Sequence, residues 1–116
     1  MERRYDLEER IESFAKDVIA LCNGLPKSNV NAELVSQLVR SAGSVGANYI
    51  EANDGLSQKD FVHRIRICRK EAKESRYWLR LLATTNLQFE DRLANLARES
   101  TELMNIFGAI LKKSST

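Results

Sequence analysis

Apolar residues recur along most of the chain at alternating steps of three and four, which is the spacing of one face of a helix. Four segments follow this pattern, and they predict helices over residues 6–23, 30–52, 58–86 and 90–113. The clearest run lies in the third segment: Phe61, Ile65, Cys68, Ala72, Ser75, Leu79 and Leu82. No segment alternates apolar and polar residues with period two, so no strand is predicted.

The first break lies between the first and second predicted helices. Asn23-Gly24 predicts a left-handed C-cap for the first helix, and Pro26 just beyond it prevents continuation. Asn29 or Asn31 is a plausible N-cap for the second helix, because an asparagine side chain accepts from the free backbone amides of a first turn.

The remaining breaks are equally short. Asn53-Asp54-Gly55 predicts a turn, Ser57 is placed to cap the third helix, and the fourth helix ends with Lys112 and Lys113 at its negative pole. Short connections make sequential helices antiparallel, and a repeat near 3.5 residues favours shallow crossings. The expected architecture is therefore all-α, a single antiparallel up-down-up-down four-helix bundle over residues 1–116.

Composition agrees with a folded domain and indicates the cellular compartment in which it works. Hydrophobic residues make up 43% of the 116 residues, charged residues 29%, and the formal net charge is +2. The first residues lack the apolar stretch of a signal peptide, and no apolar run reaches membrane length. Cys22 and Cys68 both fall on apolar helix positions, so we expect two reduced thiols in a cytoplasmic protein.

The third predicted helix has a basic face beside its apolar one. Projection at about 100° per residue places five basic residues within an arc of roughly 80°, forming a stripe about 20 Å long. They are Arg66, Arg69, Lys73, Arg76 and Arg80. Closely spaced guanidinium groups suit a polyanion, so the stripe is a candidate site for RNA or DNA. The alternative is an ordinary solvated face whose charges pair elsewhere.

A third face of the same helix holds Ile67, Trp78 and Leu81, away from the main core. A large aromatic and two aliphatic residues there indicate a second contact surface, and hence a homo-oligomer. The alternative is that they lie under the helix–helix loops of a monomer. Gly43 and Gly46 interrupt the second helix at a cost of about 1 kcal/mol each, which points to close packing within the subunit or between subunits.

Candidate chemistry is sparse. A di-metal bundle site needs glutamate–histidine pairs three residues apart, whereas His63 is the one histidine and Asp60 stands three before it. We see no phosphate-binding loop, nucleophile elbow or cysteine–histidine pair, so we expect no enzyme, no metal, no cofactor and no small-molecule substrate. Four polar residues are interpreted instead as an interhelical network that fixes register: Asn48, Glu51, Glu71 and Glu74.

The chain resembles a known protein family over nearly its whole length, and two segments carry the most specific part of that resemblance. S-V-G-A-N-Y-x-E-A at residues 44–52 and E-A-x-E-S-x-Y-W-L at residues 71–79 resemble the bundle proteins encoded by intervening sequences of bacterial 23S ribosomal RNA genes. The stretches at 40–43, 60–65 and 69–70 agree. The four residues of the polar network match recurrent polar positions of this family.

The resemblance implies a cytoplasmic bacterial protein that assembles as a ring-like homopentamer without enzymatic activity. A related branch of this family comprises the accessory variability proteins of diversity-generating retroelements. The resemblance implies that these proteins are basic pentameric barrels that bind nucleic acid and a reverse transcriptase. The leading hypothesis is therefore a non-enzymatic homopentamer that binds RNA or another nucleic acid through the basic stripe. The alternative is a protein–protein interaction adaptor that receives a partner on the face of Ile67, Trp78 and Leu81.

Overall fold

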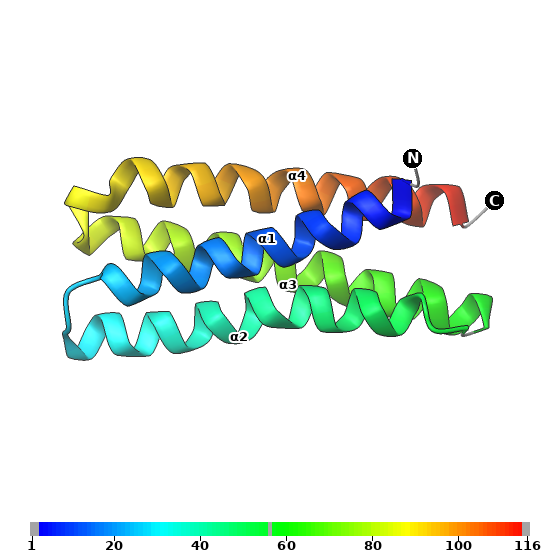
Figure 1. Ribbon diagram of the computed structural model, residues 1–116, viewed down its shortest axis with the longest axis horizontal. Helices are drawn as coiled ribbons and strands as arrows, with labels where there is room; N and C mark the ends of the chain where they lie inside the picture. The colour runs from blue at the N-terminus through cyan, green and yellow to red at the C-terminus, as the bar shows by residue number, and fades with distance from the viewer. Residues whose placement is uncertain (1–2, 56, 115–116) are drawn as a thin grey trace.

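The computed structural model describes residues 3–55 and 57–114, with side chains from Asp6 onward, and these residues form four long antiparallel helices (Figure 1). The molecule measures 45 × 26 × 19 Å. No strand occurs in the described ranges, so the predicted all-α four-helix bundle is confirmed. The elements in chain order are α1 (Arg3–Gly24), α2 (Asn29–Ala52), α3 (Gln58–Thr85), a short 3-10 helix η1 (Leu87–Phe89) and α4 (Glu90–Ser114).

The apolar repeat of each helix becomes the core. On α1 and α2 the buried residues include Leu7, Ile11, Phe14, Val18, Leu21, Leu38, Ala42, Val45 and Tyr49. On α3 and α4 they include Ile65, Cys68, Ala72, Leu79, Leu82, Leu93, Leu103 and Phe107. Burial of these side chains removes apolar surface from water, which is the main favourable contribution to folding. The spacing in the sequence therefore identifies the inner face of every helix.

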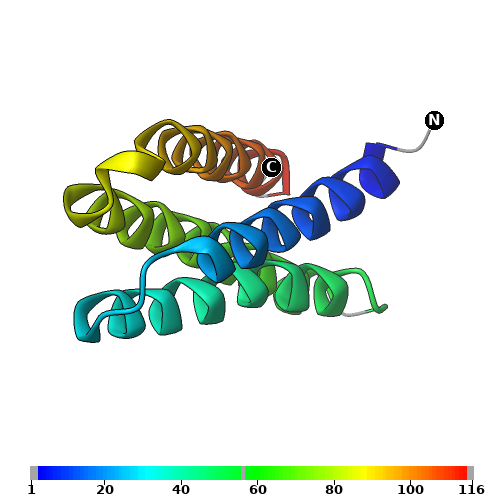
Figure 2. The same cartoon turned by 60° about the vertical axis from the view of Figure 1, so that its left-hand side comes forward.

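Helix α1 is the least parallel member of the bundle. Figure 2 shows it crossing obliquely over the others, with its first turns diverging from α3 and α4. Near the crossing, a Cβ atom built on Gly46 of α2 would lie 3.4 Å from Cγ2 of Ile11. Gly46 thus faces Ile11 within the subunit, at a distance where an added Cβ atom would make an ordinary, short van der Waals contact. Gly43, by contrast, has nothing within 4 Å of such a Cβ atom.

Two local predictions at the first break are wrong. Ser28, not Asn29 or Asn31, caps α2, because its side chain accepts a hydrogen bond of 3.0 Å from the backbone N–H of Asn31. Among the described residues Gly55 is the one glycine with positive φ, so Gly24 does not end α1 in a left-handed conformation. Chain reversal here depends on Pro26 and on the burial of Asn31.

The later breaks follow the sequence more closely. Gly55 has φ 75°, a conformation that glycine adopts without the steric cost of a Cβ atom, at the predicted turn. Ser57 caps α3 by accepting a hydrogen bond of 3.2 Å from the backbone N–H of Asp60, as predicted. Lys112 and Lys113 lie in the last turn of α4. The second turn and the third helix are therefore determined largely by local chemistry.

A pair of buried amides joins the two loops at one end of the bundle. Asn31 and Asn86 each donate to the other's side-chain oxygen at 2.9 Å, forming a reciprocal pair. The remaining N–H groups reach backbone carbonyls, with Asn31 donating to Pro26 and Asn86 to Leu82, each at 2.8 Å. Because all four donor groups are satisfied, the pair costs little to bury and fixes where α2 begins relative to the end of α3.

Replacement of Asn86 by alanine is expected to lower the free energy of unfolding by about 2–3 kcal/mol, because it leaves one N–H and the side-chain oxygen of buried Asn31 without a partner and removes a donor to the Leu82 carbonyl. Urea denaturation at fixed protein concentration measures the loss. The exposed Asn29 gives the control, since Asn29→Ala should change stability by less than about 0.5 kcal/mol. Equal effects of the two substitutions would show that the amide pair does not hold the bundle end.

Candidate nucleic-acid interface

The basic stripe lies along the edge where α3 meets α4. It comprises Arg66, Arg69, Lys73, Arg76 and Arg80, four of them exposed and Arg76 half-buried. Nη1 of Arg76 donates to Oγ1 of Thr101 on α4 at 3.1 Å, and Nε of Arg69 lies 3.9 Å from the Cβ position of Gly108. The structure therefore brings the stripe against a side of α4 with small side chains.

No carboxylate neutralises the stripe within the part of the chain that the structure describes: none of its five residues forms an ion pair there. Acidic residues of α4 pair on the opposite side, where Arg10 of α1 binds Glu99 at 2.6 Å and also binds Glu102. The hydrogen bond to Glu99, and to a smaller extent the one to Glu102, raises the pKa of Arg10, so its guanidinium stays charged. The five side chains of the stripe are thus without an ion pair in the described chain, and Glu90 is the one acidic residue among those that line a hollow beside them.

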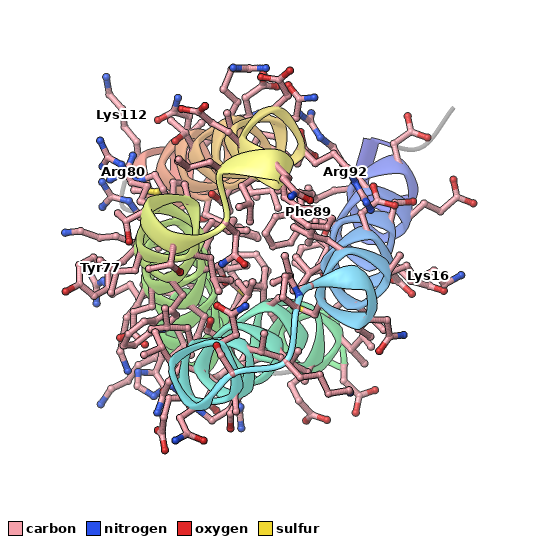
Figure 3. The ribbon with its side chains drawn as sticks, turned by 90° about the vertical axis from the view of Figure 1, so that its left-hand side faces the viewer. Lys16, Tyr77, Arg80, Phe89, Arg92 and Lys112 are labelled. Carbon is pink, nitrogen blue, oxygen red and sulfur yellow. The ribbon has the colours of Figure 1, made fainter. Side chains whose placement is uncertain are left out.

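One basic residue of α4, Lys112, lies on the side of this edge. In Figure 3, a view along the bundle, Lys112 of α4 and Arg80 of α3 project on the same side. Lys16 and Arg92 project from the other side of the bundle, near α1. Lys112 therefore lies on the same side of the bundle as the basic stripe, although the net charge of the chain is only +2.

A hollow of about 510 Å³ lies in the same edge, and we name it the α3–α4 furrow. Its polar lining is Arg76, Arg80, Glu90, Arg98 and Thr101. Its apolar lining is Leu79, Ala83, Leu93, Ala94 and Ala97. The furrow exists because α4 presents alanines where it faces the arginines of α3, so no bulky side chain fills the space.

The α4 side of the furrow was missed by sequence reasoning, which considered the basic residues of α3 alone. A signal was nevertheless present, because Ala94, Ala97, Thr101 and Gly108 follow three-, four- and seven-residue steps along one side of α4. Such a row of small residues next to the core marks the side where a neighbouring helix carries long side chains. Arg98 stands on the same side, one residue after Ala97.

The polar network predicted for Asn48, Glu51, Glu71 and Glu74 is divided in the structure. Asn48 accepts a hydrogen bond of 2.8 Å from Nη1 of Arg64, which joins α2 to α3. Glu71 and Glu74 lie instead beside Arg40, at 4.0 and 3.7 Å. Glu51 is exposed and belongs to neither group. Two separate links, two turns apart on α2, thus connect α2 with α3.

The face of Ile67, Trp78 and Leu81 is half-buried, and Trp78 packs against the core. Tyr77, which is 55% exposed, meets Trp78 edge to face with ring centroids 5.0 Å apart. Two buried polar atoms near this face have no hydrogen-bond partner among the described residues: Nε1 of Trp78 and Oε1 of Glu71, whose residue is only 6% exposed. Buried polar groups are rarely left unpaired in a complete assembly.

The two cysteines, the histidine and the acidic residues form no reactive or metal-binding cluster within the described residues. Burial raises the pKa of the Cys68 thiol to about 12 and also raises that of Cys22, so neither is an activated nucleophile. His63 is exposed, and no group of three or more histidine, cysteine or acidic residues that could hold a metal ion occurs in residues 3–55 and 57–114. Within these ranges no helix has the length and hydropathy needed to span a bilayer.

A second hollow, of about 650 Å³, lies at the end of the bundle where α1 diverges. Its lining is mainly aliphatic and aromatic: Leu7, Tyr49, Phe61, Ile106, Ala109 and Ile110, with Asp6, Arg10, Asn53 and Lys113 around them. Its surface is therefore chemically unlike the furrow, and it does not extend the cationic edge.

The fold places this chain in the class of small four-helix bundle proteins. The chain belongs to the 23S rRNA-intervening sequence protein family, whose model matches residues 3–109. A crystal structure of a protein of unknown function from the S23 ribosomal protein family of Bacteroides thetaiotaomicron is 29% identical, with a TM-score of 0.81. The match covers 96% of this chain and 99% of that one. No curated protein matches by sequence.

Proposed function

We propose that this protein is a non-enzymatic homo-oligomer of the bacterial cytoplasm that binds RNA through the basic stripe. The observation that supports this most directly is the set of five basic side chains on one edge, without an ion-pair partner in the described chain. A surface built for solubility alone would intersperse acidic groups, as the other sides of this bundle do. The stripe is instead arranged as a row of phosphate partners.

The energetics favour a polyanion over a small anion. Each phosphate that a lysine or arginine neutralises releases condensed counterions, and this entropy gain accumulates along a strand. Exposed side chains such as Arg69 and Lys73 lose little hydration free energy on binding, because they are not withdrawn into the core. The stripe extends about 20 Å along α3, so several consecutive phosphates can bind at once.

The homo-oligomer, which we propose to be a pentamer, uses the outer surfaces of α2 and α3, including Ile67, Trp78 and Leu81. Two observations support an interface there. Nε1 of Trp78 is buried without a hydrogen-bond partner among the described residues. Gly43 imposes its helix cost of about 1 kcal/mol although nothing in the subunit approaches its Cβ position. A second subunit that packs closely on α2 would account for that glycine.

Light scattering tests both parts of the proposal. At low salt we expect a discrete species near five times 13.2 kDa that gains mass when RNA is added, and we expect moderate salt to remove the RNA but not the oligomer. A species of 13.2 kDa at micromolar concentration would refute the assembly. An oligomer whose mass is indifferent to RNA at low salt would refute the nucleic-acid role while leaving the assembly in place.

Substitution of Gly43 distinguishes an interface from an empty surface. Gly43→Leu should leave the helix content unchanged, because the Cβ position is open within the subunit, yet it should lower the oligomer mass. Ala20→Leu, on an exposed position of α1, is the matched control and should leave the mass unchanged. Retention of the full mass by Gly43→Leu would place the interface elsewhere than on this side of α2.

A protein–protein adaptor is the second candidate, favoured by the exposed Tyr77 beside Trp78. Aromatic residues of this kind anchor partners in many interfaces. In that case Tyr77→Ala would abolish capture of a partner protein, whereas neither the wild type nor the variant would gain mass with RNA. Recovery of nucleic acid alone with the purified wild type would count against the adaptor.

A further inference from the structure

The α3–α4 furrow has a composition that the phosphate backbone alone does not use. Arg76, Arg80 and Arg98 line the furrow together with small apolar side chains, including Ala94 and Ala97. Phosphates bind guanidinium groups but gain nothing from alanine side chains, which are better suited to a flat, partly apolar group. The furrow volume of about 510 Å³ falls within the range of small-ligand sites, which is roughly 300–1,000 Å³.

We propose that the furrow binds an unpaired nucleotide, so that the RNA recognised by this protein is single-stranded at that point. This inference rests on the proposed RNA-binding function of the same edge. In an A-form duplex the bases are stacked and paired, and the deep major groove admits no helix edge. An unpaired base can turn out of the stack without breaking a base pair, enter the furrow and place one face on the alanines while a guanidinium plane stacks on the other.

The lining is prepared for such a ligand. The hydrogen bond of 3.1 Å from Arg76 to Thr101 holds one guanidinium at the furrow wall, which reduces the entropy lost on binding. Glu90 lines the furrow but forms no ion pair with Arg80 or Arg98 among the described residues. Nη2 of Arg98 donates to Oδ1 of Asn95 at the exposed rim, so Arg80 is the guanidinium without a hydrogen-bond or ion-pair partner there in the described chain. Arg69 and Lys73 continue the stripe beyond the furrow and supply contacts for the neighbouring phosphates.

Fluorescence anisotropy with one labelled RNA of about 12 nucleotides, free or annealed to its complement, tests the inference. Wild-type protein should bind the free strand about tenfold more tightly than the duplex. Ala94→Leu fills the furrow without changing charge and should remove this preference, while binding to the duplex stays within about twofold. Ala20→Leu is the control for an added leucine on an exposed helix position, and circular dichroism verifies that both variants are folded.

Failure of this inference differs from failure of the proposed function. Equal affinity of the wild type for strand and duplex, or an unchanged preference in folded Ala94→Leu, would overturn the unpaired-nucleotide site and leave RNA binding by the stripe intact. Absence of binding to both RNAs at low salt would overturn the proposed function and the inference together. Should Ala94→Leu fail to fold, Ala94→Gln provides a second filling side chain at the same exposed position.

Discussion

Reversal of three charges, in the variant Arg69→Glu, Lys73→Glu and Arg76→Glu, is expected to lower RNA affinity by about 100-fold near 0.1 M salt. Each phosphate contact to a single strand contributes about 0.7 to the slope of log affinity against log salt, so loss of three contacts lowers that slope by about 2. Repulsion between the new carboxylates and the phosphates adds to the loss. The magnitude follows because no acid in the described chain already neutralises these side chains.

A matched control separates location from net charge. Lys16→Glu, Lys27→Glu and Arg92→Glu change the formal net charge equally, since three reversals each remove two charges and take +2 to −4. Lys16 and Arg92 lie away from the α3–α4 edge (Figure 3). The control should lose less than about tenfold in affinity and keep its salt slope. Equal losses in the two variants, or an unchanged slope in the stripe variant, would contradict binding at the stripe.

The bundle could be predicted from sequence because each helix repeats its apolar residues over about four turns or more and each break is short. In α3 the residues of the predicted heptad from Ile65 to Leu82 are buried, and Phe61 is half-buried at the helix start. Periodicity of this length depends only on helical geometry and burial, and both are local properties of the chain. Side-chain direction on α3 could be predicted for the same reason.

The inclination of α1 and the amide pair at the bundle end could not be predicted in this way. Both depend on which residues meet across helices. Gly46 of α2 faces Ile11 of α1, and Asn31 contacts Asn86, which lies 55 residues later in the sequence. Asn31 has a residue type equally suited to an N-cap, so its local chemistry gave a misleading assignment. Ser28 is the N-cap instead, because its hydroxyl accepts the hydrogen bond from the backbone N–H of Asn31. The side chain of Asn31 is therefore not needed as a cap and lies inside the bundle.

The candidate interface was partly predictable for a related reason. The basic stripe follows from spacing on α3 alone, whereas the furrow requires knowing that Ala94 and Ala97 of α4 face Arg76 and Arg80. The polar network divides because Arg40 lies within reach of Glu71 and Glu74, while Asn48 reaches Arg64. Antiparallel pairing gives the approximate register, but long side chains choose among several neighbours within one turn.

Replacement of Phe107 by alanine is expected to lower the free energy of unfolding by about 3–5 kcal/mol. Phe107 is 0% exposed on α4, and its ring centroid lies 6.3 Å from that of Tyr49 on α2, at a tilt of 50°. Truncation removes the transfer free energy of the ring and leaves a cavity between helices that cannot fully close. The tilted aromatic contact with Tyr49 adds to the loss.

Urea denaturation followed by circular dichroism measures this change at one fixed protein concentration, because the proposed assembly would make apparent stability depend on concentration. Leu87→Ala is the control: Leu87 is 71% exposed, so its truncation should cost less than about 0.5 kcal/mol. A loss below about 1 kcal/mol for Phe107→Ala would mean that the centre of the bundle relaxes around the missing ring. The diverging α1 would then be the element that moves inward, because it packs least extensively on its neighbours.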